Sequence, residues 1–235
     1  MSREQKYALV TGCGKGGIGE ALVKQYVRQG VHAIATVLPS ENSEHLTREG
    51  ITWFPLDVTD ENSVADLKQS ILRLTGGSLD VLVNNALPGY TMTAIDTDVN
   101  SVKRMFDVNL FGPMQMVHYF HDMIIRTTGT IVNIGSIGGV VPYMYGGSFY
   151  TPLASEFKKH VQRTPETTDR FDYAANVVSQ SLRPSPVAWF WYGKATSIIR
   201  FFDTFAWRTF WDYVFWREFK LGKMQKAHFA TKRVE

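Results

Sequence analysis

Short apolar runs alternate with stretches of helical periodicity over the first 134 residues. Residues 7–11 form an apolar run that ends at a glycine turn, and helical spacing follows over 17–30. Later runs predict strands at 32–37, 51–56, 81–83 and 129–134, with helices at 62–74 and 98–126. Strands that alternate with helices predict a parallel, doubly wound α/β sheet with helices on both faces, a three-layer αβα domain.

The second half of the chain has a different pattern. Residues 169–182 suit one helix, which Pro184 and Pro186 end, and residues 187–192 predict a short strand. Between Trp189 and Phe219, fourteen of 31 residues are aromatic. Polar and apolar side chains separate on a helical projection of this segment, which is typical of an interfacial helix. A helix lying on a membrane surface and a hydrophobic cap over a substrate pocket are the two open interpretations.

Length and composition limit the alternatives. A chain of 235 residues suits one domain over 1–235, which would include the aromatic-rich segment 189–221. The single cysteine, Cys13, cannot form an internal disulfide, and we identify no secretory signal, so we expect a cytoplasmic, reducing compartment. The net charge of +3 comes from interspersed charges, which disfavours nucleic acid as a partner. We expect no transmembrane helix, because no apolar run reaches 18 residues.

A glycine-rich turn joins the first strand to the first helix, and it reads Thr11-Gly12-Cys13-Gly14-Lys15-Gly16-Gly17-Ile18-Gly19. Glycines leave room for a diphosphate, and the helix N-terminus offers amides and a partial positive charge. Together with Asp57, Asn84-Asn85-Ala86, Asn109 and Ser136, this turn resembles the short-chain dehydrogenase/reductase family. The turn is one residue longer than the family's usual TGxxxGxG spacing, and in this it is similar to the turn of a fungal branch that includes NADPH-dependent 1-acyl-dihydroxyacetone-phosphate reductase. The resemblance implies a Rossmann-like fold.

The resemblance also implies a nicotinamide cofactor. Asp57 would hold the adenine, or alternatively would only cap the next helix. The end of the second strand offers neither the acid that binds NAD nor an arginine for NADP. Lys15 in the turn therefore favours NADP, with NAD as the alternative and a solvated loop lysine as the plainer interpretation. The candidate cofactor-binding residues are Gly12, Cys13, Lys15, Gly17, Ile18, Gly19, Asp57, Asn84, Asn85 and Ala86; none is assigned to a metal.

The catalytic set is incomplete. By resemblance, Asn109 keeps a water in a proton relay and Ser136 hydrogen-bonds a substrate carbonyl. The family's catalytic tyrosine is followed four residues later by a lysine, which lowers the pKa of the phenol. No tyrosine of this chain has a lysine at that spacing. The candidate is Tyr150, one position beyond the family's place for it.

Two interpretations of the missing motif stay open. In the first, Tyr150 is a shifted catalytic tyrosine served by Lys158 or Lys159. Eight residues correspond to roughly 12 Å along a helix, however, and Pro152 disturbs the start of that helix. In the second, an internal block is absent after Gly146, and it would include the Tyr-x-x-x-Lys helix and the sixth strand.

An absent block has structural consequences. The sheet would be truncated at the sixth strand, and the predicted strand 187–192 would pair beside 129–134. The helix over 113–126 would lose the neighbour through which the family dimerises, so a family-type dimer is in doubt. Apolar surface would be exposed there.

Two functions agree with these features. One is an NADP(H)-dependent oxidoreductase that reduces a carbonyl or oxidises an alcohol on a small lipophilic or secondary-metabolite substrate. The other is a catalytically inactive NADP(H)-binding or scaffold protein. Peripheral contact of the aromatic segment with the surface of the endoplasmic reticulum or of lipid droplets is a further expectation.

Overall fold

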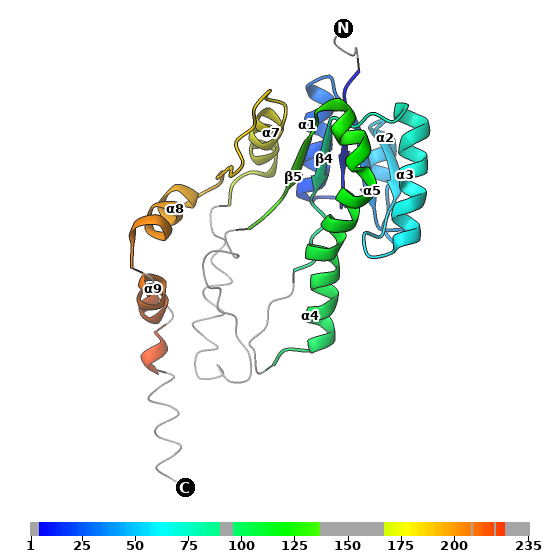
Figure 1. Ribbon diagram of the computed structural model, residues 1–235. Helices are drawn as coiled ribbons and strands as arrows, with labels where there is room; N and C mark the ends of the chain where they lie inside the picture. The colour runs from blue at the N-terminus through cyan, green and yellow to red at the C-terminus, as the bar shows by residue number, and fades with distance from the viewer. Residues whose placement is uncertain (1–4, 90–95, 137–166, 208, 219, 224–235) are drawn as a thin grey trace. The chain divides into compact units, whose positions relative to one another are not determined.

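The computed structural model describes residues 5–89, 96–136, 167–207, 209–218 and 220–223 (Figure 1). Contacts group the chain into two compact units. The first unit comprises Met1–Gly89, Lys103–Ile134 and Thr168–Phe190, and the second comprises Tyr90–Val102, Gly135–Thr167 and Trp191–Glu235. That the whole chain is a single domain stays a prediction.

A five-stranded parallel sheet forms the centre of the first unit. Its strands are β1 (Tyr7–Val10), β2 (His32–Val37), β3 (Thr52–Pro55), β4 (Val81–Asn84) and β5 (Thr130–Asn133). Their order is β3-β2-β1-β4-β5, and each neighbouring pair is parallel. The order reverses between β1 and β4, which is the point where ligands bind in doubly wound sheets. The predicted Rossmann-like fold is confirmed.

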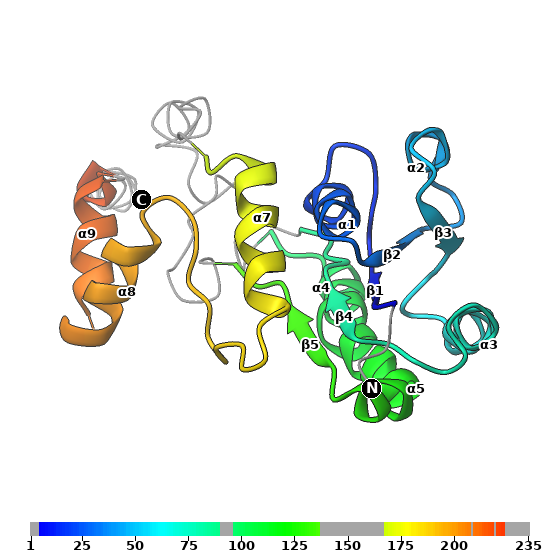
Figure 2. The same ribbon diagram turned by 90° about the horizontal axis from the view of Figure 1, so that it is seen from above.

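Helices cover both faces of the sheet and complete the predicted three layers (Figure 2). One face carries α1 (Ile18–Arg28), α2 (Glu44–Arg48) and α7 (Arg170–Ser181), and the other carries α3 (Glu61–Thr75) and α5 (Gly112–Thr127). Side chains alternate along a strand. Ala8 and Val10 therefore join the buried cluster that includes residues of α1 and α7, whereas Leu9 joins the cluster that includes residues of α3 and α5.

The sheet ends at β5 among the described residues. All four residues of β4 are buried, whereas β5 alternates between half-buried and exposed positions, with Ile131 exposed. The prediction of a strand at 187–192 is wrong, because these residues form no strand and pair with no other strand of the described sheet. An aromatic run alone does not make a strand, since its backbone also needs a hydrogen-bonding neighbour. The predicted truncation at the sixth strand agrees with this edge.

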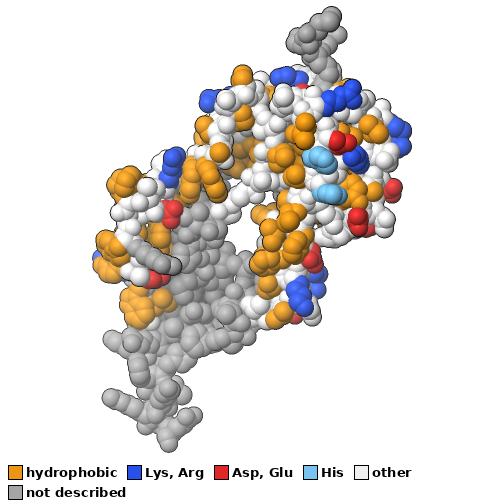
Figure 3. All heavy atoms as spheres, viewed as in Figure 1, with side chains coloured by type: hydrophobic (Ala, Val, Ile, Leu, Met, Phe, Trp, Pro, Cys, Tyr) orange, Lys and Arg blue, Asp and Glu red, His pale blue; other side chains and the backbone are white. Residues whose placement is uncertain are grey.

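The long helix between β4 and β5 contains a π turn. α4 (Val99–Phe106) continues through η1 (Asp107–Phe111) into α5, so the helix changes its winding near Gly112-Pro113 without stopping. Pro113 has no N–H, and its ring crowds the carbonyl of the residue four positions earlier, which favours a looser turn. That residue is Asn109. Apolar side chains are exposed along η1 and the beginning of α5, as the loss of a neighbour predicts (Figure 3).

The described part of the second unit contains two aromatic helices, α8 (Thr196–Phe205) and α9 (Phe210–Glu218). The backbone is extended at Ala206 between them, so the predicted interfacial segment is two short helices. Phe202 of α8 stacks on Phe210 of α9 with 4.5 Å between the ring centroids. Within the described ranges, no helix combines the length and apolar character that crossing a membrane requires.

Candidate functional site

The glycine turn lies against the segment that follows β4. Gly12 has a φ of +69°, and a Cβ there would lie 2.7 Å from the Cα of Ala86. The hydroxyl of Thr11 accepts hydrogen bonds from the backbone amides of Asn85 at 2.9 Å and Ala86 at 3.0 Å. The side-chain amide of Asn85 donates to the carbonyls of Thr11 and Gly12 at 2.8 and 2.9 Å. The two predicted cofactor segments therefore hold each other in place.

The beginning of α1 has the shape of an anion cradle. Gly17 occupies the N-cap position and has no side chain to bond the first amides of the helix. A Cβ at Gly19 would lie 2.7 Å from Nδ2 of Asn85, so only glycine fits between the turn and the segment after β4. Lys15 and Ile18 are exposed beside it. Helix amides that no side chain covers, with room for a ligand above them, fit the diphosphate of a dinucleotide.

Two predicted cofactor residues make local contacts. The thiol of Cys13 is buried and donates to the carbonyl of Val10 at 3.3 Å, and burial raises its pKa to about 12. The Cys13 side chain therefore faces the core, and only the backbone of Cys13 can contact a ligand in the turn. A carboxylate oxygen of Asp57 accepts from the amide and the hydroxyl of Thr59 at 2.9 and 2.7 Å. Asp60, and not Asp57, caps α3.

A hollow of roughly 570 Å³ lies at the carboxyl ends of β4 and β5. Its lining is mostly apolar and consists of Asn84, Ala86, Leu87, Asn109, Leu110, Pro113, Met114, Val117, His118, Asn133 and Ile134. The side-chain oxygens of Asn84 and Asn109 are buried and have no hydrogen-bond partner in the described part of the chain. Their Nδ2 atoms donate to Oδ1 of Asn133 at 2.8 Å and to the carbonyl of Pro88 at 3.4 Å. Few polar groups in an apolar hollow are typical of a small-molecule site.

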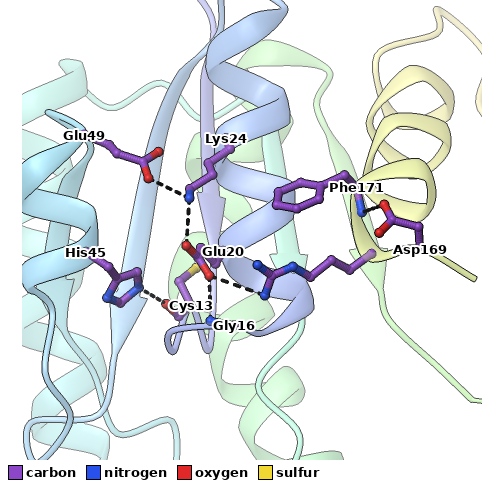
Figure 4. A network of polar contacts seen from close by, with 9 residues as sticks. Cys13, Gly16, Glu20, Lys24, His45, Glu49, Asp169 and Phe171 are labelled. Carbon is purple, nitrogen blue, oxygen red and sulfur yellow. Dashed lines mark hydrogen bonds and ion pairs between the residues drawn. The ribbon is translucent and has the colours of Figure 1, made fainter. Parts of the chain in front are cut away.

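Glu20 links the glycine turn to neighbouring helices (Figure 4). It is 5% exposed, and its two oxygens accept from the Gly16 amide at 2.6 Å and from Nζ of Lys24 at 2.7 Å. Burial alone would raise the pKa of this carboxyl, but the hydrogen bonds from Lys24 and Gly16 outweigh burial and lower the pKa. Arg170 of α7 lies 3.6 Å from the same Glu20 oxygen that Gly16 bonds. The sequence analysis missed both residues, because only the fold brings Arg170 to the turn.

Glu41 is a second acid at the turn that the sequence analysis missed. One of its carboxylate oxygens accepts from the amide of Leu38 at 3.3 Å. Both oxygens lie 3.5 Å from the position that a Cβ of Gly14 would occupy. An acid near the end of the second strand is the group that binds the ribose 2′-hydroxyl of NAD. The sequence did carry a signal for Glu41, because it is an acidic residue in the loop shortly after β2.

The remaining catalytic candidates are not part of the hollow within the described residues. Ser136 belongs to the second unit, is exposed and follows the end of β5 by three residues. Tyr150 lies outside the described residues. The structure thus brings Asn84 and Asn109 together, and the roles of Ser136 and Tyr150 stay predictions.

Comparisons with known proteins identify the family. The profile of short chain dehydrogenases matches residues 6–152. Short-chain dehydrogenase virD from Hypocrea virens is 60% identical, over 98% of this chain and 98% of its own. The NADPH-dependent 1-acyldihydroxyacetone phosphate reductase from Schizosaccharomyces pombe is 39% identical, over 64% of this chain and 51% of its own. The solved structure of ElxO with NADP bound has a TM-score of 0.54 and 29% identity, over 59% of this chain and 58% of that chain.

The alignment with virD also bears on the missing motif. It spans 282 positions, more than the 235 residues of this chain. The aligned region therefore contains positions at which the relative has residues and this chain has none, which agrees with the interpretation that residues are absent from this chain; that they form one block after Gly146 stays a prediction. The sheet order, the glycine turn and these matches agree, and the chain belongs to the short-chain dehydrogenase family.

Proposed function

We propose that the chain is an NADP(H)-dependent oxidoreductase that reduces a carbonyl group, or oxidises the corresponding alcohol, on a lipophilic substrate. The observation that carries the proposal is the glycine cradle, in which a Cβ at Gly12 or Gly19 would collide with the segment after β4. A bound nicotinamide supplies or accepts a hydride in this reaction. The chain's own residues bind the dinucleotide and orient the substrate.

The preference for NADP rests on two observations. Lys15 is exposed in the turn, where an ammonium attracts a 2′-phosphate. The Schizosaccharomyces pombe relative is named for its dependence on NADPH, and ElxO was solved with NADP. NAD(H) is the second candidate, because the Glu41 carboxylate lies beside Gly14 and would repel a 2′-phosphate.

The lipophilic substrate is supported by the hollow beside β4 and β5. Apolar side chains of the segment after β4, of η1 and of α5 line it, and the buried oxygens of Asn84 and Asn109 offer acceptors for a hydroxyl or a water. Its volume is within the range of small-molecule sites. The Schizosaccharomyces pombe relative is named for an acylated substrate, which agrees with such a lining.

A two-step measurement tests the proposal. NADPH and NADH fluorescence is followed as the protein is added, and NADPH consumption is then measured with a panel of apolar ketones. We expect tighter binding of NADPH than of NADH, and NADPH consumption that depends on the ketone. Tyr150→Phe then distinguishes the two interpretations of the missing motif, because turnover is lost only if the Tyr150 hydroxyl transfers the proton. The relatives give no support to an inactive protein. Binding without turnover of any ketone or of the reverse alcohol would nevertheless contradict the reaction, and failure to bind either dinucleotide would contradict the cofactor.

A further inference from the structure

Arg170 of α7 is a cation that reaches the glycine turn. Its Nη1 lies 3.5 Å from the position that a Cβ of Gly16 would occupy, and its side chain is 35% exposed. Because α7 packs against α1 in the first unit, a residue from late in the chain reaches the phosphate cradle. Within the described residues, the Arg170 guanidinium donates no hydrogen bond, and its polar contact is the ion pair with Glu20.

The acid beside Arg170 is already satisfied by other groups. Glu20 receives hydrogen bonds of 2.6 and 2.7 Å from Gly16 and Lys24, whereas its contact with Arg170 is 3.6 Å. Lys24 in turn is shared between Glu20 and Glu49, at 2.7 and 2.6 Å. A guanidinium has five N–H donors, and a single long ion pair uses few of them. Arg170 is therefore the cation of this network that can bind another anion, because the Glu20 carboxylate keeps its hydrogen bonds from Gly16 and Lys24.

The guanidinium is also held in position before any ligand arrives. Asp169 caps α7 by accepting from the amides of Phe171 and Asp172 at 2.8 and 3.1 Å, which fixes the first turn of the helix. The guanidinium carbon lies 4.8 Å from the centroid of the Phe171 ring. Stacking on an aromatic ring restricts an arginine side chain and leaves its N–H edge available.

We propose that Arg170 is a cofactor-binding residue that contacts the diphosphate of the nicotinamide dinucleotide at the beginning of α1. The proposal rests on the proposed function, since it needs a dinucleotide in the cradle. Arginine binds phosphate oxygens through two parallel N–H donors, and such charge-assisted bonds are stronger than neutral ones. The chain thus supplies a diphosphate ligand from α7 in addition to the backbone of the turn.

The test compares three ligands that share a diphosphate. Dissociation constants are measured for NADPH and NADH by fluorescence, and for ADP-ribose by competition with NADPH. Arg170→Gln should weaken all three by a similar factor of about 10 to 100, the effect of one charged hydrogen bond. Arg170→Lys should lose less, because it keeps the charge and loses the two-point geometry. Arg183→Gln is the matched control beyond the other end of α7, about 18 Å away for its 12 residues, and should bind as wild type does.

The outcomes separate this proposal from the proposed function. Wild-type protein that binds none of the three ligands contradicts both. Wild-type binding with an unchanged constant in Arg170→Gln overturns the role of Arg170 alone, even if the urea midpoint of the free protein falls. A loss confined to NADPH would place Arg170 at the 2′-phosphate and likewise overturn the diphosphate contact. If Arg170→Gln does not fold, Arg170→Lys decides, because it keeps the pair with Glu20.

Discussion

Gly12 and Gly30 have the same left-handed backbone in different surroundings. Their φ values are +69° and +73°, but a Cβ at Gly12 would meet the backbone of Ala86 whereas nothing lies within 4 Å at Gly30. Overpacking costs ~1–3 kcal/mol beyond the backbone strain that both share. Gly12→Ala should therefore lower the free energy of unfolding by that much more than Gly30→Ala in urea denaturation. Only Gly12→Ala should also lose NADPH binding; equal losses would mean that the turn can move away from Ala86.

Neutralising the Glu41 carboxylate tests whether the protein prefers NADPH or NADH. Glu41→Gln removes a carboxylate beside Gly14, so it should favour the dinucleotide that carries the extra 2′-phosphate. We expect the ratio of the NADH to the NADPH dissociation constant to rise by about fivefold, or ~1 kcal/mol. Glu44→Gln is the control, because Glu44 pairs with Arg48 at 2.6 Å on exposed α2. An unchanged ratio in Glu41→Gln would separate Glu41 from the cofactor.

A buried pair of hydroxyls, Tyr26 and Ser181, joins α1 to α7. Ser181 gives its only proton to the carbonyl of Val178 at 2.9 Å, so Tyr26 must be the donor in the 2.8 Å bond between the two side chains. Ser181→Ala leaves the buried Tyr26 hydroxyl without an acceptor and should cost ~1–3 kcal/mol in the free energy of unfolding. Adding Tyr26→Phe removes the Tyr26 hydroxyl, which has lost its acceptor in Ser181→Ala. The double variant should then cost less than the sum of the two single variants in denaturant titrations, and strict additivity would contradict the donor assignment.

Helices and strands with strong local patterns were predicted correctly from the sequence, whereas features that depend on contacts between distant residues were not. The run over 32–37 coincides with β2, and 169–182 encloses α7, because strong periodicity and the two prolines after α7 are local signals. The strand predicted at 187–192 fails, since pairing depends on a neighbouring strand. The glycine turn was found by its spacing and Asn109 by the resemblance to the family, and their contacts agree with a shared site. Arg170 and Glu41 were missed, because their place at the turn depends on helix packing and on a folded-back loop.

The aromatic segment of the second unit tests whether the protein binds lipid. Phe201, Phe205 and Trp207 are exposed, and apolar side chains grouped on short helices are typical of an interfacial segment. The expectation of peripheral membrane contact predicts that the full chain co-sediments with liposomes, and that Phe201→Ser with Phe205→Ser lowers the partition coefficient at least tenfold.

A matched control keeps this measurement interpretable. Leu72→Ser with Leu74→Ser removes exposed apolar side chains from α3 of the first unit and should leave co-sedimentation unchanged. If the aromatic variant binds liposomes as wild type does, the membrane interpretation is wrong, and a hydrophobic cap within the protein becomes the remaining interpretation of the segment.

Burial of the only cysteine makes the natural sequence ready for spectroscopic labelling. Burial raises the pKa of the Cys13 thiol to about 12, so the thiol stays protonated at pH 8, whereas maleimides react with the thiolate. Cysteines introduced at exposed Asp66 and Asp203 would then be the only reactive ones, one in each unit. A spin-label pair on those two positions would report the distance between the units directly, with no native thiol to remove beforehand.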